Sequence, residues 1–156
     1  MASEAAVINP TIEKFGYPGS LLREYDHWLV LLRPAQVTAG SLILAAKGDA
    51  TAYGVLSREA FAEQAVAIAE IEATLRCAVE YDRINYLMLM MVDPHVHFHV
   101  IPRYAGSRTI AGIEIADAGW PGPPDLKSAV GLDSEAMAAG CSEMLSNWQV
   151  AESKPG

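Results

Sequence analysis

Four short hydrophobic runs along the chain predict the strands of a sheet. Residues 28–32 (WLVLL) and 41–46 (SLILAA) have the length and aliphatic content of strands. Residues 85–92 are almost continuously apolar, which is typical of a strand covered on both faces. An Asp-Pro pair at residues 93–94 interrupts this pattern, because proline cannot donate a hydrogen bond to a sheet. Residues 95–103 then resume as a further strand.

Two other segments carry apolar residues at the helical spacing of three to four. Ser57 is a good N-cap for the first helix, which extends to about residue 80. Its predicted buried stripe consists of Phe61, Ala65, Ile68, Ile71, Leu75 and Val79. The second helix is predicted over residues 134–148, where Gly140 is a weak position. Its apolar stripe consists of Met137, Cys141, Met144, Leu145 and Trp148.

The remaining segments contain turn-forming residues and predict little regular structure. Residues 1–20 indicate an irregular arm, and the Gly- and Pro-rich residues 105–133 indicate an ordered loop. We therefore expect an α+β fold: an antiparallel sheet of about four or five strands, one long helix packed on it, and a C-terminal helix. The length fits a single domain, 1–156, with its core at about 20–104 and an arm and helix at 105–156.

Composition narrows the class of protein. Hydrophobic residues make up 51% of the chain and charged residues 19%, which excludes a disordered protein. The net charge of −8 argues against nucleic-acid binding, where affinity comes from neutralising many phosphates. No run approaches the ~20 apolar residues of a membrane span, and the N-terminus has no signal-peptide pattern. With Cys77 and Cys141 expected to be reduced, these features predict a cytoplasmic protein.

The most informative segment is the run HVHFHVI at residues 95–101. Three of the four histidines in the chain occur here, at every second position. Because side chains alternate between the faces of a strand, His95, His97 and His99 are predicted to share one face. The intervening apolar residues face the core, so the imidazoles must line a polar site.

Two kinds of chemistry could use three imidazoles in a row. Metal binding is one, but His95 and His99 would lie about 13 Å apart on a strand at ~3.3 Å per residue, too far for one ion to collect all three. The nearest downstream acid is Glu114, so no further ligand is close in sequence. Nucleophilic catalysis is the other, because a neutral imidazole nitrogen can attack phosphorus while flanking imidazoles bind the phosphate oxygens.

The motif resembles the signature of the histidine triad (HIT) family, three histidines each followed by an apolar residue. The following Pro102-Arg103-Tyr104 is similar to bacterial members related to dinucleoside polyphosphate hydrolases. The resemblance implies a homodimeric α+β protein that acts on a nucleotide-type small molecule without a cofactor or bound metal. It implies a nucleotide hydrolase or nucleotidyl transferase that attacks the α-phosphate of an anhydride, a phosphoramidate or a dinucleoside polyphosphate.

The resemblance also implies roles for the three histidines. His97 would be the nucleophile that forms a nucleotidyl-histidine intermediate, and His95 would orient it. His99 would contact the phosphate or assist the leaving group. Ser41 and Arg103 are candidate substrate-binding residues, the latter as a phosphate contact or in a plain salt bridge.

The sequence departs from the family pattern at three places. Ser41 occupies the position of a further histidine found in many members, and Arg33 lies about where an acid or amide grips the ribose. A guanidinium there favours an anion over a sugar diol. Asp93 and Pro94 replace a glycine-rich stretch. Two alternatives therefore stay open: a catalytically weak nucleotide-binding or interaction module of the same fold, and a histidine-ligated metal protein.

Overall fold

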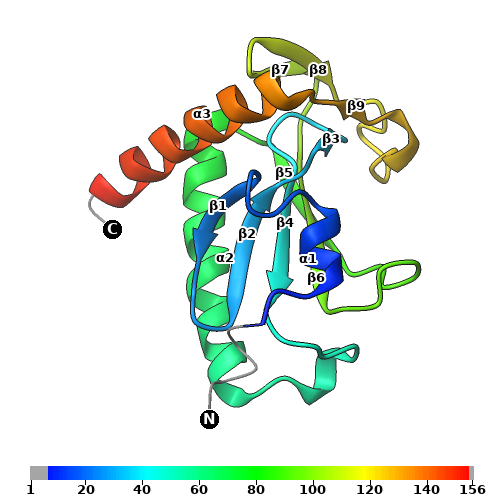
Figure 1. The fold of residues 1–156 in the computed structure, drawn as a ribbon. Helices are drawn as coiled ribbons and strands as arrows, with labels where there is room; N and C mark the ends of the chain where they lie inside the picture. Colours follow the sequence, from blue (N-terminus) through cyan, green and yellow to red (C-terminus); the bar gives the residue numbers. More distant parts are fainter. Residues whose placement is uncertain (1–6, 155–156) are drawn as a thin grey trace.

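A five-stranded antiparallel sheet forms the centre of the molecule (Figure 1). The computed structural model describes residues 7–154. In spatial order the strands are β1 (Leu21–Glu24), β2 (Trp28–Leu32), β4 (Leu42–Ala46), β6 (His97–Arg103) and β5 (Arg83–Leu87). The predicted α+β class and strand number are confirmed.

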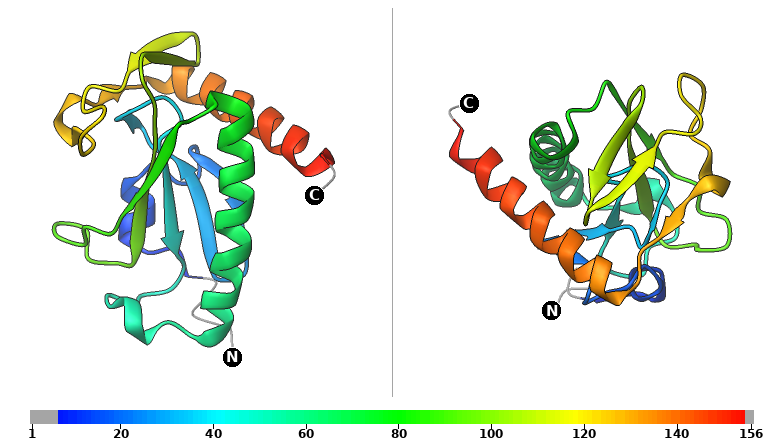
Figure 2. Two further views of the ribbon diagram at one scale, coloured as in Figure 1. Left: turned by 180° about the vertical axis from the view of Figure 1, so that it is seen from behind. Right: turned by 90° about the horizontal axis from the view of Figure 1, so that it is seen from above.

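Two long helices pack on one side of this sheet. α2 (Arg58–Val79) runs along the strands, and α3 (Ser134–Ser153) crosses α2 near one end of that helix (Figure 2). Ser57 caps α2 as predicted, because its side chain accepts a hydrogen bond from the Ala60 amide. α3 continues five residues beyond the predicted end at 148. No helix within residues 7–154 is long and apolar enough to span a membrane.

The predicted buried stripe of α2 is wrong in the first half of the helix. Phe61 and Ala65 are exposed, whereas Gln64 and Ala67 are buried. Gln64 tolerates burial because its Oε1 accepts a hydrogen bond from the hydroxyl of Tyr53. The second half of the helix follows the prediction, because its buried residues include Ile71, Leu75 and Val79.

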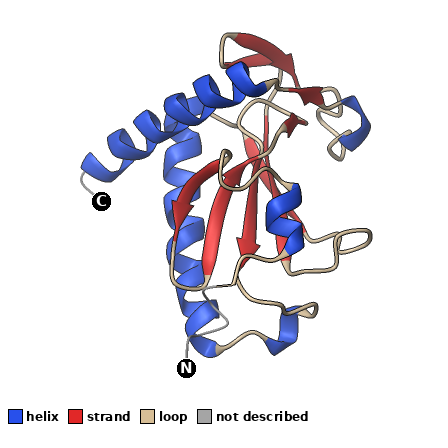
Figure 3. Ribbon diagram, viewed as in Figure 1, coloured by secondary structure: helices blue, strands red, loops and turns tan. Residues whose placement is uncertain are grey.

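Residues 105–133 contain more regular structure than a loop. β7 (Ser107–Ile110) and β8 (Ile113–Ala116) form a hairpin, and the short β9 (Val130–Gly131) pairs with β3 (Ala35–Gln36) (Figure 3). Ile110 and Ile115 from the hairpin are buried in the main core together with residues of α3. The core therefore extends past residue 104.

Two further predictions about segments near the sheet are wrong. The N-terminal arm contains a short helix, α1 (Pro10–Lys14), which Asn9 caps; residues 1–6 of that arm lie outside the described range. The strand predicted over residues 85–92 ends at Leu87, and β5 is an edge strand. Met91 is 85% exposed, so this stretch is a surface loop and not a strand covered on both faces.

Alternation along the strands divides the interior into two clusters. Even-numbered residues of β6, such as Val100, join the large core under α2 and α3. On the opposite face Ile43 and Ala45 of β4 pack with Ile12 and Phe15 of the N-terminal segment. We call this second face, which also carries His97 and His99, the histidine face.

A buried ion pair ties the hairpin segment to the sheet. Arg103 donates to the carboxylate of Asp117 at 2.7 Å, and both side chains are almost fully buried. Replacing Asp117 by alanine is expected to lower the free energy of unfolding by about 3–5 kcal/mol, because the guanidinium is left buried without a counter-ion. Denaturant unfolding measures this loss of free energy of unfolding. Glu152→Gln, which breaks the exposed pair with Arg23, is the control and should cost less than about 1 kcal/mol; equal effects would contradict the prediction.

Candidate active site

The histidine face is built around β6, which lies between β4 and β5. The register places His97 beside Ala45, and His99 between Ile43 and Leu87. Both imidazoles are buried, with 2% of His97 and 8% of His99 exposed. Their ring centroids lie 5.1 Å apart at a steep angle, so the prediction that these two share one face holds in the structure.

The prediction that His95 also lies on the strand is wrong. β6 begins at His97, and residue 95 sits in a bend that follows the Asp93-Pro94 interruption. The His95 ring instead contacts the N-terminal helix, where its Nδ1 lies 2.9 Å from Oγ1 of Thr11. His95 reaches His97 through its backbone carbonyl and not through its ring.

A hydrogen bond between these two histidines fixes the tautomer of His97. Nδ1 of His97 lies 2.7 Å from the carbonyl oxygen of His95. A carbonyl oxygen only accepts, so Nδ1 must carry the proton. In the neutral ring, Nε2 then carries the lone pair and is the nucleophilic nitrogen.

His99 is held in the complementary tautomer. The Nε group of Arg33 donates to Nδ1 of His99 at 3.3 Å. Burial, followed by the nearby Arg33 charge, lowers the pKa of His99 to about 4, so the ring is neutral at pH 7. Because Nδ1 accepts, the proton is on Nε2, which can donate a hydrogen bond to a substrate oxygen. The two rings therefore offer one lone pair and one N–H donor.

The N-terminal segment covers both rings. The ring of Phe15 lies 5.6 Å from that of His97 and 5.8 Å from that of His99, measured between centroids. Lys14 forms an ion pair with Asp93 at 2.8 Å, which joins α1 to the loop before β6. Phe15 therefore packs against both imidazoles and contributes to their burial.

Ser41 and Arg103, the two candidate substrate-binding residues, both form hydrogen bonds within the protein. Ser41 is fully buried, and its hydroxyl bonds to the backbone of Thr38 in the turn before β4. Arg103 donates to both oxygens of Asp117 and to Oδ1 of Asn85. These contacts match the salt-bridge alternative for Arg103 and give both residues structural partners.

Three residues of the N-terminal segment that contact the histidine region were not predicted from the sequence. Thr11, Lys14 and Phe15 come from a stretch that the sequence predicts as irregular. The signal for this helix was present, because Asn9 followed by Pro10 is an N-cap followed by proline in the first turn.

The metal-binding alternative finds no support in the side-chain geometry. Within residues 7–154, no three His, Cys, Asp or Glu side chains lie together as a metal site.

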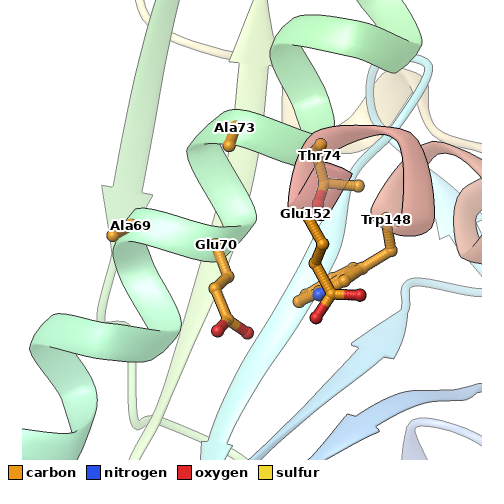
Figure 4. A pocket seen from close by; sticks show the side chains of 7 residues that line it. Ala69, Glu70, Ala73, Thr74, Trp148 and Glu152 are labelled. Carbon is orange, nitrogen blue, oxygen red and sulfur yellow. The ribbon is translucent and has the colours of Figure 1, made fainter. Parts of the chain in front are cut away.

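A hollow of about 160 Å³ lies on the other side of the sheet, between α2 and α3 (Figure 4). Its walls include Ala73, Thr74 and Trp148, so it is remote from the histidines.

Solved structures with the same fold are histidine triad proteins. A histidine triad protein from Sinorhizobium meliloti 1021 is 21% identical, with 90% of this chain and 96% of that chain covered and a TM-score of 0.69. A hypothetical histidine triad nucleotide-binding protein from Sulfolobus tokodaii strain7 is 17% identical, with 88% and 91% covered and a TM-score of 0.64. A zinc-bound histidine triad family protein from Mycobacterium smegmatis is 17% identical, with 97% and 100% covered and a TM-score of 0.60.

The similarity lies in the fold and not in the overall sequence. No protein-family model matches the chain, and no curated protein matches it. At identities of 17–21% the comparison establishes the arrangement of sheet and helices.

The neutral state of His99 can be measured directly. NMR titration is expected to give His99 a pKa of about 4, and Arg33→Met should raise it, because a nearby positive charge is removed. The pKa should stay below 6.5, since burial is the larger cause. The unfolded chain binds this proton more readily, so the contribution of His99 to stability is lost as the pH falls from about 6.5 to about 4. Arg58→Gln is the control; an ordinary pKa in the wild type would contradict the assignment.

Proposed function

We propose that this chain, which has the fold of histidine triad proteins, is a nucleotide hydrolase or nucleotidyl transferase with His97 as its nucleophile. The observation that carries the proposal is the hydrogen bond from Nδ1 of His97 to the His95 carbonyl. It leaves the lone pair on Nε2 and holds the ring in one orientation. The nucleotide-binding protein from Sulfolobus tokodaii, which has the same fold, supports a nucleotide as the substrate.

The reaction proceeds in two displacements. In the first, Nε2 of His97 attacks the α-phosphorus, a P–N bond forms, and the bond to the leaving group breaks with its electron pair on that group. The imidazole becomes positively charged, and the His95 carbonyl at 2.7 Å stabilises the charge. In the second, water attacks phosphorus, the P–N bond breaks, and one proton passes to solvent.

His99 acts as a hydrogen-bond donor in this scheme. Its Nε2–H points away from the Nδ1 that Arg33 engages, and it can bind a non-bridging oxygen of the phosphate. His95 is a positioning residue, because its carbonyl orients His97 while its ring is anchored by Thr11. Arg33 positions His99 in turn.

One observation favours a second candidate, a nucleotide-binding module with negligible turnover. Phe15 covers both imidazoles, and only 2% of His97 is exposed. A nucleotide that binds beside this cover without contacting His97 would be held without catalysis. The homodimer, the cytoplasmic location and the dinucleoside polyphosphate branch remain predictions from the sequence.

A trapped intermediate tests the proposal. Wild-type protein is mixed with adenylated and guanylated phosphoramidates and dinucleoside polyphosphates, quenched with acid-free denaturant, and analysed by intact mass. We expect a nucleotidyl adduct on the wild type and none on His97→Ala, because Nε2 of His97 is the proposed nucleophile. Turnover should fall by at least about 10⁴-fold, as for removal of other catalytic nucleophiles.

His27→Ala provides the matched control. This fourth histidine lies in the bend before β2 and has no part in the proposed reaction, so its removal should leave both the adduct and the turnover unchanged. Nucleotide binding without adduct or turnover would instead establish the binding module. Phe15→Ala then shows whether the cover over His97 is what prevents reaction.

A further inference from the structure

Two buried polar atoms without a hydrogen-bond partner lie in the same part of the molecule. Among the buried side-chain nitrogen and oxygen atoms of residues 7–154, Oγ1 of Thr74 and Nε1 of Trp148 are the two that have no partner. Thr74 lies on α2 and Trp148 on α3, and these residues are 0% and 1% exposed. A buried polar group without a partner lowers stability, so each one calls for a structural reason.

Both residues line one hollow on the side of the sheet away from the histidine face. We call it the α2–α3 hollow; its volume is about 160 Å³, and its lining residues are Ala69, Glu70, Ala73, Thr74, Trp148, Ala151 and Glu152. Figure 4 shows Thr74 and Trp148 projecting from the two helices into the space between them. The hollow exists because alanines form much of its wall, where longer side chains would close the gap between the helices.

Trp28 shows how a buried indole is normally satisfied in this protein. This tryptophan is also fully buried, and its Nε1 donates to the carbonyl oxygen of Ala60 at 2.7 Å. The indole of Trp148 is buried to the same degree, yet no acceptor in the described part of the chain receives its N–H. The α2–α3 hollow therefore offers a donor from Trp148 and a hydroxyl from Thr74 to a molecule from outside the chain.

Charged side chains border the hollow. Glu70 and Glu152 belong to its lining, and Arg23 of β1 lies 3.9 Å from the first carboxylate and 2.7 Å from the second. The guanidinium also lies 5.8 Å from the centre of the Trp148 ring. The side chains of Arg23 and Glu152 are 39% and 45% exposed, so their ion pair contributes little to stability and can open to admit a ligand.

These groups select the kind of ligand. An ammonium group only donates hydrogen bonds, so an amine would leave the indole N–H of Trp148 without a partner. An anion would accept that bond, but the two carboxylates of Glu70 and Glu152 outnumber the one guanidinium beside them and repel it. Water needs two to four polar partners, which the alanines in the wall do not offer. A neutral hydroxyl group both accepts and donates, and it meets all of these conditions.

We propose that the α2–α3 hollow binds a small neutral molecule of the phenol class, a planar ring that carries one hydroxyl group. The hydroxyl oxygen accepts a hydrogen bond from Nε1 of Trp148, and the hydroxyl proton is donated to Oγ1 of Thr74. The ring lies against the alanines, and a cavity of about 150 Å³ is large enough for benzene, so the volume of the hollow suits one ring. The site is separate from the histidine face, and the inference does not rest on the proposed function.

Two probes of nearly the same shape test the inference. Phenol and toluene differ in the group that the site is proposed to recognise, a hydroxyl in one and a methyl in the other. Each is titrated into isotope-labelled wild type, and the backbone and indole N–H resonances are followed by NMR. We expect phenol to bind about tenfold more tightly than toluene, as for the net gain from two hydrogen bonds, and to move the Trp148 indole proton downfield.

Two results of this titration would overturn the proposal. Equal affinities for phenol and toluene would show that the hollow does not recognise a hydroxyl group. A Trp148 indole resonance that phenol does not move would show that ordered water, and not a ligand of this class, is the partner of Nε1.

Two substitutions separate recognition of the hydroxyl from loss of space. Thr74→Val keeps the shape of the side chain, so both probes should still bind while the preference for phenol falls to less than about threefold. Ala73→Leu fills the hollow and should abolish the binding of both probes. Ala65→Leu, the same change at an exposed position of α2, is the matched control and should bind both probes as the wild type does. Unchanged phenol binding in Ala73→Leu would overturn the assignment to the hollow.

The ligand-free protein gives a readout that does not depend on the probes. Thr74→Val removes a buried hydroxyl that has no partner, so its thermal midpoint should be higher than that of the wild type. Saturating phenol should reverse the order, because phenol stabilises the wild type more than the variant. A lower midpoint for ligand-free Thr74→Val would show that the hydroxyl is already satisfied, and it would overturn the proposal.

A last comparison tests whether the hollow is independent of the histidine face. His97→Ala should bind phenol as tightly as the wild type, because Trp148 belongs to the core on the opposite side of the sheet. Loss of phenol binding in His97→Ala would place phenol at the histidines and overturn the proposal.

Discussion

The alternation of side chains along β6 is the constraint on which the rest of the molecule depends. The strand lies between β4 and β5 and is hydrogen-bonded to both, so its register is fixed on two sides. Even-numbered residues enter the large core under α2, and odd-numbered residues form the histidine face. A slip of one residue would move His97 and His99 into the large apolar core and Val100 onto the histidine face, which makes the register strongly specified.

Local patterns, either a regular period or a short apolar run, were the part of the fold that the sequence could predict. The helices α2 and α3 follow from a repeat of 3.6 residues, and the shared face of His97 and His99 from a repeat of 2. The strands β2 and β4 follow from short continuous apolar runs. The start of β6 did not follow, because alternation of residue types cannot show where the backbone enters a sheet. His95 continues the pattern in sequence, yet it lies in a bend and contributes its carbonyl to His97.

Contacts between distant segments set the limit of prediction. The partner of Arg103 is Asp117, which comes from a segment that the composition presents as a loop. The cover over the histidines joins residues more than 80 positions apart, as in the contact of Thr11 with His95. Asn85 looked like the first residue of an apolar strand, and only the register with β6 places it opposite Ile101, within hydrogen-bond distance of Arg103. Neither periodicity nor composition carries such information.

The position of Arg33 beside His99, in a protein of net charge −8, has a consequence for how ligands arrive. At low ionic strength, where the Debye length reaches ~30 Å, an approaching polyanion responds to the net charge of −8 and is repelled. A short phosphate compound escapes most of this repulsion once its charge lies against Arg33. A long nucleic-acid strand would instead extend over the acidic surface. Association with small anions should therefore become faster as added salt screens the surface, which is the reverse of the salt dependence of nucleic-acid-binding proteins.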